Sequence, residues 1–162
     1  MTDLISMAAP AGALLKQHRQ TIAVSESACG GLISASLVAV PGASAYYVGG
    51  AVVYTRAAQW GLLNVPDHAM ADMRASTEPY ALLNARAIRE SLGATWALAE
   101  TGASGPTGNR YGDAAGHACI AVAGPIDRVI TLETGETDRE ANMWTFARAA
   151  LELLERCVRE SN

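Results

Sequence analysis

The sequence predicts a single α/β domain over residues 1–162, built as three layers with helices on both faces of a mixed β-sheet. Short β-prone runs alternate along the chain with segments of helical periodicity, which is the pattern of α/β folds. A chain of 162 residues suits one compact domain with a sizeable core. Half of the residues are apolar and 17% are charged, so the composition favours a folded chain over a disordered one.

The first predicted elements are a helix, a strand and a second helix. Helical periodicity covers residues 3–18. Residues 21–25 (TIAVS) are β-prone, and a turn of small residues leads from them into a helix over 32–40. Pro41 ends that helix, because proline cannot continue the backbone hydrogen bonding.

A short strand is predicted at 51–54, followed by a helix at 56–63 and a helical stretch at 66–73. The next helix is predicted from the cap Thr77 to about residue 92, because an acidic residue and a proline occupy its first turn and a glycine follows its end.

The second half of the sheet is predicted from three apolar runs. Residues 95–100 have the composition of a buried strand, and 117–123 and 128–133 are predicted as adjacent strands joined by a turn. From residue 138 to the end, apolar residues recur with helical spacing, at Trp144, Ala147, Leu151, Leu154 and Val158.

Composition excludes several classes of function. A net charge of −4 and a pI near 5.3 argue against a non-specific nucleic-acid surface. No apolar run reaches the roughly 18–20 residues that span a bilayer, and the first residues lack the early positive charge of a signal peptide. The three cysteines and three histidines are scattered, without the spacing of disulfide frameworks or metal sites. We therefore expect a cytoplasmic protein with free thiols, no metal, and no membrane or nucleic-acid partner.

The first candidate ligand loop is residues 25–31 (SESACGG), between a strand and a helix. Glycines at a helix N-terminus leave backbone N–H groups open toward an anion such as phosphate, and Ser27 adds a hydroxyl. The alternative is a tight strand-to-helix turn in which Ser27 is the N-cap.

The second candidate loop is residues 101–108 (TGASGPTG). Its glycines, proline and hydroxyl residues could wrap a polar ligand, and the alternative is a structural Ω-like turn.

The third candidate segment is residues 41–59 (PGASAYYVGGAVVYTRAAQ). Ser44 is predicted on a loop or turn, Tyr54 at the end of a strand, and Gln59 in the following helix. A serine hydroxyl is a poor nucleophile until a base takes its proton. Of twelve basic residues only Lys16 is a lysine, and arginine is a poor general base, so the segment has no evident base of its own.

Together and in this order, the three segments resemble the CinA C-terminal domain family. That family carries AESCTGG, then PGSSAYF-x-GGVVTYSNEAK, then VTGIAGPTGG, and the corresponding runs here are residues 25–31, 41–59 and 100–108. Two looser matches are residues 75–78 to the family's GAVSEE and residues 138–139 to its GDR. The resemblance runs over nearly the whole chain.

The resemblance implies a three-layer α/β domain that hydrolyses the carboxamide of nicotinamide mononucleotide to nicotinic acid mononucleotide and ammonia. It further implies the stand-alone form of the domain, a homodimer, and no cofactor or metal. Ser44 and Tyr54 fall on the family's catalytic serine and tyrosine, and Gln59 falls on its catalytic lysine. Because a glutamine side chain does not titrate, the base is missing, and Glu26 is one candidate substitute.

The predicted substrate-binding residues come from the first two loops and the start of the last helix, where Arg139 would neutralise the phosphate. They are Glu26, Ser27, Gly30, Gly31, Thr101, Gly102, Gly105, Gly108 and Arg139. Two functions follow: an amidohydrolase with altered or weak activity, or a nucleotide-binding module that serves as a sensor or partner subunit. A third reading is an unrelated small-molecule enzyme on the same fold.

Overall fold

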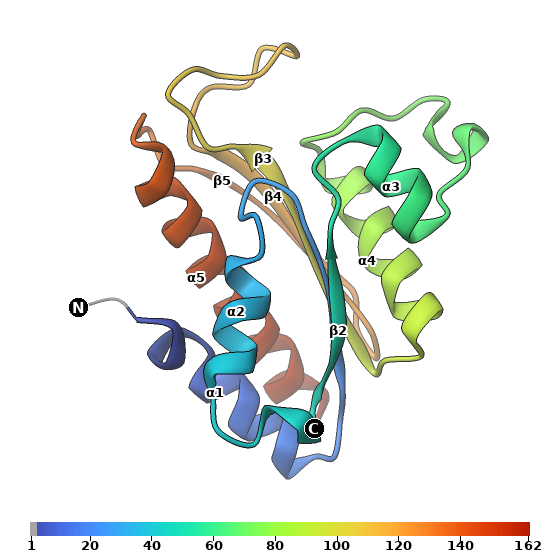
Figure 1. The fold of residues 1–162 in the computed structure, drawn as a ribbon, viewed down its shortest axis with the longest axis vertical. Coiled ribbons are helices and arrows are strands. Elements are labelled where there is room, and N and C mark those ends of the chain that lie inside the picture. Colours follow the sequence, from blue (N-terminus) through green and yellow to red (C-terminus); the bar gives the residue numbers. More distant parts are fainter. Residues whose placement is uncertain (1–2) are drawn as a thin grey trace.

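The computed structural model describes residues 3–162 and confirms the predicted α/β class (Figure 1). The described residues form one mixed sheet with strand order β2-β1-β3-β4-β5. The strands β2, β1 and β3 are parallel to one another, whereas β4 and β5 run antiparallel to their neighbours. The strands are β1 (Ile22–Glu26), β2 (Tyr47–Val52), β3 (Trp96–Ala103), β4 (His117–Ala123) and β5 (Arg128–Glu133).

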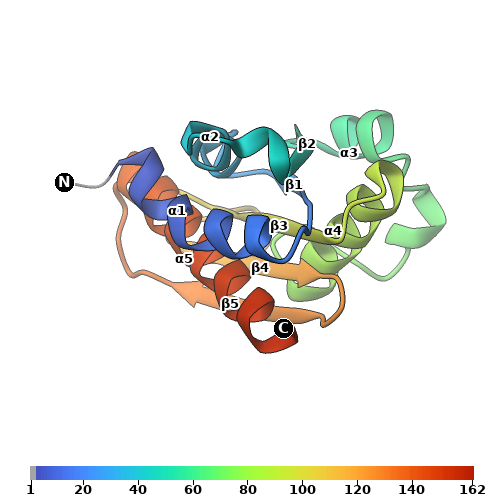
Figure 2. The same cartoon turned by 90° about the horizontal axis from the view of Figure 1, so that it is seen from below.

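Helices cover both faces of this sheet, which gives the three predicted layers. Figure 1 shows α1, α2 and α5 on one side of the sheet and α3 and α4 on the other, and the view of Figure 2 shows the sheet between them. The helices are α1 (Leu4–Gln17), α2 (Leu32–Ala39), α3 (Arg56–Leu63), α4 (Glu78–Leu92) and α5 (Arg139–Ser161), with short 3-10 turns η1 (Ala43–Ala45) and η2 (Asp67–Met70). None of the helices in the described part combines the length and apolar character that crossing a membrane requires.

Two hydrophobic clusters, one on each face of the sheet, hold the layers together. The cluster under α1, α2 and α5 contains the large buried side chains Tyr46, Trp96 and Phe146. The cluster under α3 and α4 is built mostly of alanines, which lets α4 pack closely on the sheet. The central strands β1 and β4 are buried at every position, whereas the edge strand β2 alternates between half-buried and exposed residues.

Several elements were predicted with the bounds that the structure shows, whereas others could not be predicted correctly without knowledge of tertiary contacts. The bounds of α3, β4 and β5 coincide with the predictions, and the Thr77 hydroxyl and Gly93 cap the ends of α4 as expected. The strand predicted at 51–54 in fact covers Tyr47–Val52, and the helical stretch predicted at 66–73 is only η2. Glycine is disfavoured in strands, so Gly49 and Gly50 concealed the first half of β2. Gly50 belongs there because a Cβ would lie 2.8 Å from the Val24 carbonyl oxygen.

The connections define where a ligand site is expected. The chain leaves β1 through α2, on one face, to reach β2, and it returns through α3 and α4, on the other face, to reach β3. In open α/β sheets, ligands bind outside the carboxyl ends of strands at the point where the connections diverge. That point here is the carboxyl end of β1 between β2 and β3, where residues 27–31, Tyr54 and the loop after β3 follow their strands.

Candidate active site

Two buried glutamates at the carboxyl edge of the sheet hold the loop of residues 27–34. The carboxylate of Glu100, in β3, accepts three backbone N–H groups of this loop. Its Oε2 accepts from Ser27 at 3.1 Å and Cys29 at 2.9 Å, and its Oε1 accepts from Ala28 at 3.1 Å. Burial raises the pKa of Glu100, and the hydrogen bonds from Cys29 and Ser27 partly offset that rise.

Glu26, the last residue of β1, caps the start of α2 in the same way. Its carboxylate accepts the N–H groups of Gly31 at 3.1 Å, Ile33 at 2.8 Å and Ser34 at 2.9 Å. These are donors that the first turn of a helix leaves without an intrahelical partner, and a negative charge there also suits the helix dipole. Glu26 is fully buried, so its carboxylate serves as a helix cap rather than as an accessible base.

The expectation that this loop turns open N–H groups toward a phosphate is therefore wrong. The two N–H groups of residues 27–34 that the glutamates do not take, those of Gly30 and Leu32, donate to the carbonyls of Ser27 and Cys29. The alternative expectation, Ser27 as N-cap, is also wrong, because Gly31 holds the N-cap position. Ser27, which is half-buried, is the residue of this loop whose hydroxyl can still contact a ligand.

Arg139 bridges two segments at the carboxyl edge of the sheet, where a ligand crevice is expected. Arg139 begins α5, and its Nη2 donates to the Tyr54 hydroxyl oxygen at 3.1 Å, just beyond β2. Its Nη1 donates to the Gly105 carbonyl, in the loop after β3. Because the Tyr54 oxygen accepts this bond, its own hydrogen is free to be donated to a ligand. The sequence predicted Tyr54, Gly105 and Arg139 in one site, and the structure brings these three together.

The loop after β3 is held in place by α5 and the segment that precedes it. The Asn142 side chain donates to the Ser104 carbonyl at 2.7 Å and to the Glu136 carbonyl at 2.9 Å. Gly105 has φ +115°, and a Cβ there would lie 2.6 Å from the Thr137 carbonyl oxygen. The glycine at this position is thus required by internal packing.

The remaining predicted binding residues of this segment have contacts inside the protein, although Gly108 itself is exposed. Thr101 is buried within β3, and its hydroxyl accepts the N–H of Ser76 at 3.1 Å. Gly102 packs on β4, where a Cβ would lie 2.4 Å from the His117 carbonyl oxygen, and a Cβ on Gly108 would lie 2.0 Å from the Asp113 carbonyl oxygen. These contacts explain the residue types without a ligand.

Gln59, at the position of the family lysine, lies between α3 and α4. Its Nε2 donates to Asn84 Oδ1 at 2.7 Å, and its Oε1 accepts from Arg56 Nη1 at 3.2 Å. The side chain is fully buried, so both polar ends of the amide have partners inside the protein. The amide therefore joins two helices and presents no basic group to the crevice.

Ser44 is exposed in η1, before the start of β2, whereas Tyr54 follows the end of β2. A six-residue strand is about 20 Å long, so the two hydroxyls lie at opposite ends of the strand. The expectation that Ser44 lines one pocket with Tyr54 is wrong within a single chain. Lys16 lies at the Ser44 end as well, with its Nζ packed against Gly42.

Sequence reasoning missed a set of hydrogen-bonded residues that anchors the segment before α4 to β4. His117 is buried, its Nε2 faces the Ser76 carbonyl at 2.8 Å, and its Nδ1 contacts Glu133. Ser76 has a positive φ of 62°, a strained conformation that its bonds to His117 and Thr101 hold in place. Glu100 could have been found from the sequence, because it is a charged residue at the end of a predicted apolar strand. The sequence around His117 contained no comparable signal.

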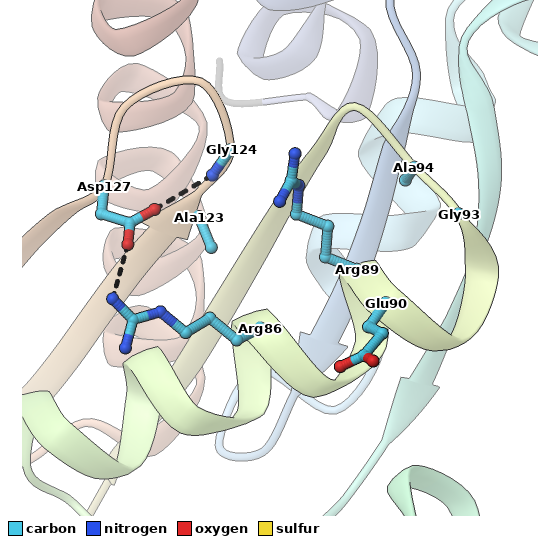
Figure 3. Close-up of a pocket in the computed structure, with 8 residues that line it drawn as sticks. All are labelled: Arg86, Arg89, Glu90, Gly93, Ala94, Ala123, Gly124 and Asp127. Atoms are coloured by element: carbon cyan, nitrogen blue, oxygen red, sulfur yellow. Dashed lines mark hydrogen bonds and ion pairs between the residues drawn. The ribbon is translucent and has the colours of Figure 1, made fainter.

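A hollow of about 580 Å³ lies at the other end of the sheet, by the start of β3 (Figure 3). Arg86 there is paired with Asp127 at 2.7 Å, and Arg89 Nε donates to the Thr95 carbonyl at 2.9 Å. These arginines tie the C-terminal part of α4 to neighbouring strands, and none of the predicted loops reaches this hollow. Among residues 3–162, His, Cys, Asp and Glu side chains form no group of three that could hold a metal ion.

The fold and the Arg139 bridge define an α/β domain with a candidate small-molecule site at the carboxyl edge of its parallel strands. The family model of the CinA C-terminal domain matches residues 4–158, and the chain belongs to this family.

Curated relatives agree with this assignment. The chain is 37% identical over 156 residues to a CinA-like protein of Gloeobacter violaceus, which covers 95% of this chain and 37% of that protein. It is 36% identical over 151 residues to a CinA-like protein of Salinibacter ruber, covering 93% of this chain and 37% of that protein. The chain thus spans little more than a third of the length of these relatives.

Solved structures have the same fold. A CinA superfamily protein from Klebsiella pneumoniae superposes with a TM-score of 0.91 at 23% identity, covering 98% of this chain and 99% of that one. The competence/damage inducible protein CihA from Agrobacterium tumefaciens superposes with a TM-score of 0.89 at 25% identity, covering 98% of this chain and 97% of that one.

Proposed function

We propose that this chain is a cytoplasmic CinA-type amidohydrolase domain that converts nicotinamide mononucleotide and water to nicotinic acid mononucleotide and ammonia. Membership in the CinA family supports this proposal. The observation that carries it is the Arg139 bridge, which brings the Tyr54 hydroxyl and the loop after β3 together over the crevice.

The contacts of the crevice suggest the role of each group. Arg139 is exposed, and its guanidinium has N–H groups beyond the two in the bridge, so it can pair with the nucleotide phosphate. Amide hydrolysis builds negative charge on the carbonyl oxygen, which needs hydrogen-bond donors. Because the N–H groups of residues 27–34 are all used internally, the hydroxyls of Tyr54 and Ser27 supply those donors.

Ammonia release from nicotinamide mononucleotide tests this function directly. We expect turnover by the wild-type chain and a loss of about tenfold or more on Tyr54→Phe or Ser27→Ala, because each removes one donor to the developing charge. Tyr111→Phe is the matched control, since Tyr111 is another exposed tyrosine whose hydroxyl accepts from an arginine, Arg110. Absence of ammonia release by the wild-type chain under all conditions would rule the function out.

A second candidate is a nucleotide-binding module without turnover, and Gln59 is the observation that favours it. The side chain at the lysine position is neutral, buried and bonded to Asn84 and Arg56, so it cannot accept a proton from a nucleophile. Calorimetry with nicotinamide mononucleotide would then detect binding that Arg139→Ala weakens, with no ammonia formed. Under either candidate, a large rate gain in Gln59→Lys indicates that the rest of the amidohydrolase site is intact.

A further inference from the structure

Trp144 departs from the packing of the rest of α5. It is the first of five apolar residues with helical spacing, and the other four, Ala147, Leu151, Leu154 and Val158, are buried in the core. Trp144 is only half-buried, and no residue among 3–162 accepts a hydrogen bond from its indole N–H. An aromatic side chain with an accessible face and a free donor is a common component of small-molecule sites.

A pocket of about 420 Å³ lies beside this tryptophan, between α5 and the start of α2, which lie on the same face of the sheet (Figure 1). Its lining residues are Leu32, Arg139, Glu140, Met143 and Trp144. The three apolar ones are half-buried, whereas Arg139 and Glu140 are exposed and add opposite charges. The volume lies within the range of about 300–1000 Å³ that small-molecule pockets have.

The pocket adjoins the candidate site in two places. Arg139 lines the pocket and also makes the bridge at the carboxyl edge of the sheet. Met143 lines the pocket and contacts the loop after β1, because its carbonyl accepts the Cys29 thiol at 3.7 Å. Tyr54 and Ser27 are not among the lining residues. The pocket therefore extends the site beyond the two hydroxyls that would hold the carboxamide.

We propose that this pocket holds the second base of a nicotinamide dinucleotide, so that the site takes a ligand extended beyond the phosphate of nicotinamide mononucleotide. The placement of that phosphate at Arg139 rests on the proposed function, whereas the pocket does not. In the mononucleotide the phosphate is the terminal group, and an apolar pocket next to it would stay unfilled. In the dinucleotide the same phosphate is joined through a second phosphate to another nucleoside, which reaches the pocket.

The lining side chains suit a base that carries an amino group. Every base has a π-face that can stack on an aromatic side chain, and Trp144 supplies one, while its indole N–H remains to donate to the ribose. Glu140 is the only carboxylate among the lining residues, and it can accept from an exocyclic amino group. The N–H groups of Arg139 that are not in the bridge can donate to the pyrophosphate. Adenine fits this set of groups.

Comparing two ligands by calorimetry tests the pocket. The wild-type chain should bind nicotinamide adenine dinucleotide about tenfold more tightly than nicotinamide mononucleotide, a difference of about 1.4 kcal/mol that base stacking can supply. Trp144→Ala should bring the ratio of the two dissociation constants close to one. Trp144→Phe keeps an aromatic face and should retain most of the preference.

Trp60→Ala is the matched control, because it makes the same change at a tryptophan of α3 that is 55% exposed and lies outside the pocket. It should keep the wild-type ratio. Equal affinity of the wild type for the two ligands overturns the inference, and so does the absence of binding by either. A ratio that Trp144→Ala leaves unchanged overturns it as well.

A dinucleotide with a different base tests the role of Glu140. Nicotinamide hypoxanthine dinucleotide replaces the amino group with an oxygen, so the wild type should bind it about tenfold less tightly than the adenine form. Glu140→Gln should reduce this difference, because an amide can donate as well as accept. Glu152→Gln, at an exposed position further along α5, should keep it. Equal binding of the two dinucleotides by the wild type overturns the assignment of Glu140 to the amino group.

Ammonia release separates this inference from the proposed function. A tenfold preference for the dinucleotide, without ammonia release from either ligand, refutes the hydrolysis and leaves the pocket standing. Ammonia release from the mononucleotide, with equal affinity for both ligands, refutes the pocket and leaves the function standing. If Trp144→Ala weakens the binding of both ligands by the same factor, the pocket holds part of the mononucleotide itself and the inference is wrong.

Discussion

Gln59 donates an amide hydrogen to Asn84 Oδ1 at 2.7 Å, across the buried contact between α3 and α4. The same amide accepts from Arg56 through its oxygen. A lysine at this position could donate to Asn84 but could not accept from Arg56. The residue that departs from the family pattern is therefore built into the packing of this chain.

Gln59→Lys should destabilise the chain by about 2–4 kcal/mol, because it buries a second cation beside Arg56 and leaves an Arg56 N–H without its acceptor. Gln59→Glu should cost less at neutral pH, since a carboxylate accepts from Arg56 and the Asn84 amide can turn to donate. Urea denaturation measures both variants.

Gln59→Met is the matched control for that comparison, since it has a similar shape, no charge and no strong acceptor. We expect the order of stability to be wild type, Glu, Met and then Lys. A lysine variant as stable as the methionine variant would mean that the added charge costs nothing, contrary to the buried environment.

Glu100→Gln should loosen the loop of residues 27–34 by about 1–3 kcal/mol. The amide has one oxygen where the carboxylate has two, so the N–H of Ala28 would face an NH₂ group instead of an acceptor. Hydrogen exchange of the Ala28 amide should become faster. Glu90→Gln, on the exposed face of α4, is the control and should change the stability by no more than about 0.5 kcal/mol.

Local signals account for much of the fold. Thr77 and Gly93 delimit α4 because a hydroxyl cap and a left-handed glycine act within one turn of the helix. The start of β2 was missed because strand pairing with β1 decided the state of Gly49 and Gly50, and a single sequence carries no information on that contact. The α/β class was predicted from the order of helices and strands along the chain, so errors in the exact boundaries did not affect it.

The site was predicted in part for a similar reason. The three loops were found from their glycines and hydroxyls, and Tyr54 and Arg139 do meet. The sequence could not show that Glu100 takes the N–H groups of a loop more than seventy positions earlier. Nor could it show that ten positions between Ser44 and Tyr54 span a whole strand, because the strand was predicted too short.

Arg139→Lys should lower substrate affinity without a matching loss of stability. A lysine keeps the positive charge but lacks the planar fork that reaches both the Tyr54 hydroxyl and the Gly105 carbonyl. We expect a rise of about tenfold in the dissociation constant for nicotinamide mononucleotide, measured by calorimetry. Arg148→Lys, further along α5, is the control and should bind as the wild type does. Equal binding by both variants would contradict the role of the bridge.

The stability of the chain should depend on pH through His117. Both ring nitrogens face acceptors, Glu133 and the Ser76 carbonyl, and only the doubly protonated imidazolium donates to both. Burial opposes this charge, but the hydrogen bonds to Glu133 and Ser76, with the nearby Asp113, outweigh it and raise the pKa of His117. The charged form is therefore stabilised in the folded chain.

Since the folded-state pKa lies above the unfolded value of about 6.5, the stabilisation is fully present below that pH and is lost as the pH rises through the folded-state pKa. Urea denaturation from mildly acidic to mildly alkaline pH should show the free energy of unfolding of the wild type falling toward that of His117→Gln. The His117→Gln protein should be less stable at the acid end and nearly flat over the same range. His68→Gln, at an exposed histidine, should keep the wild-type slope. If His117→Gln retains that slope, another group carries the dependence and His117 is not held as an imidazolium.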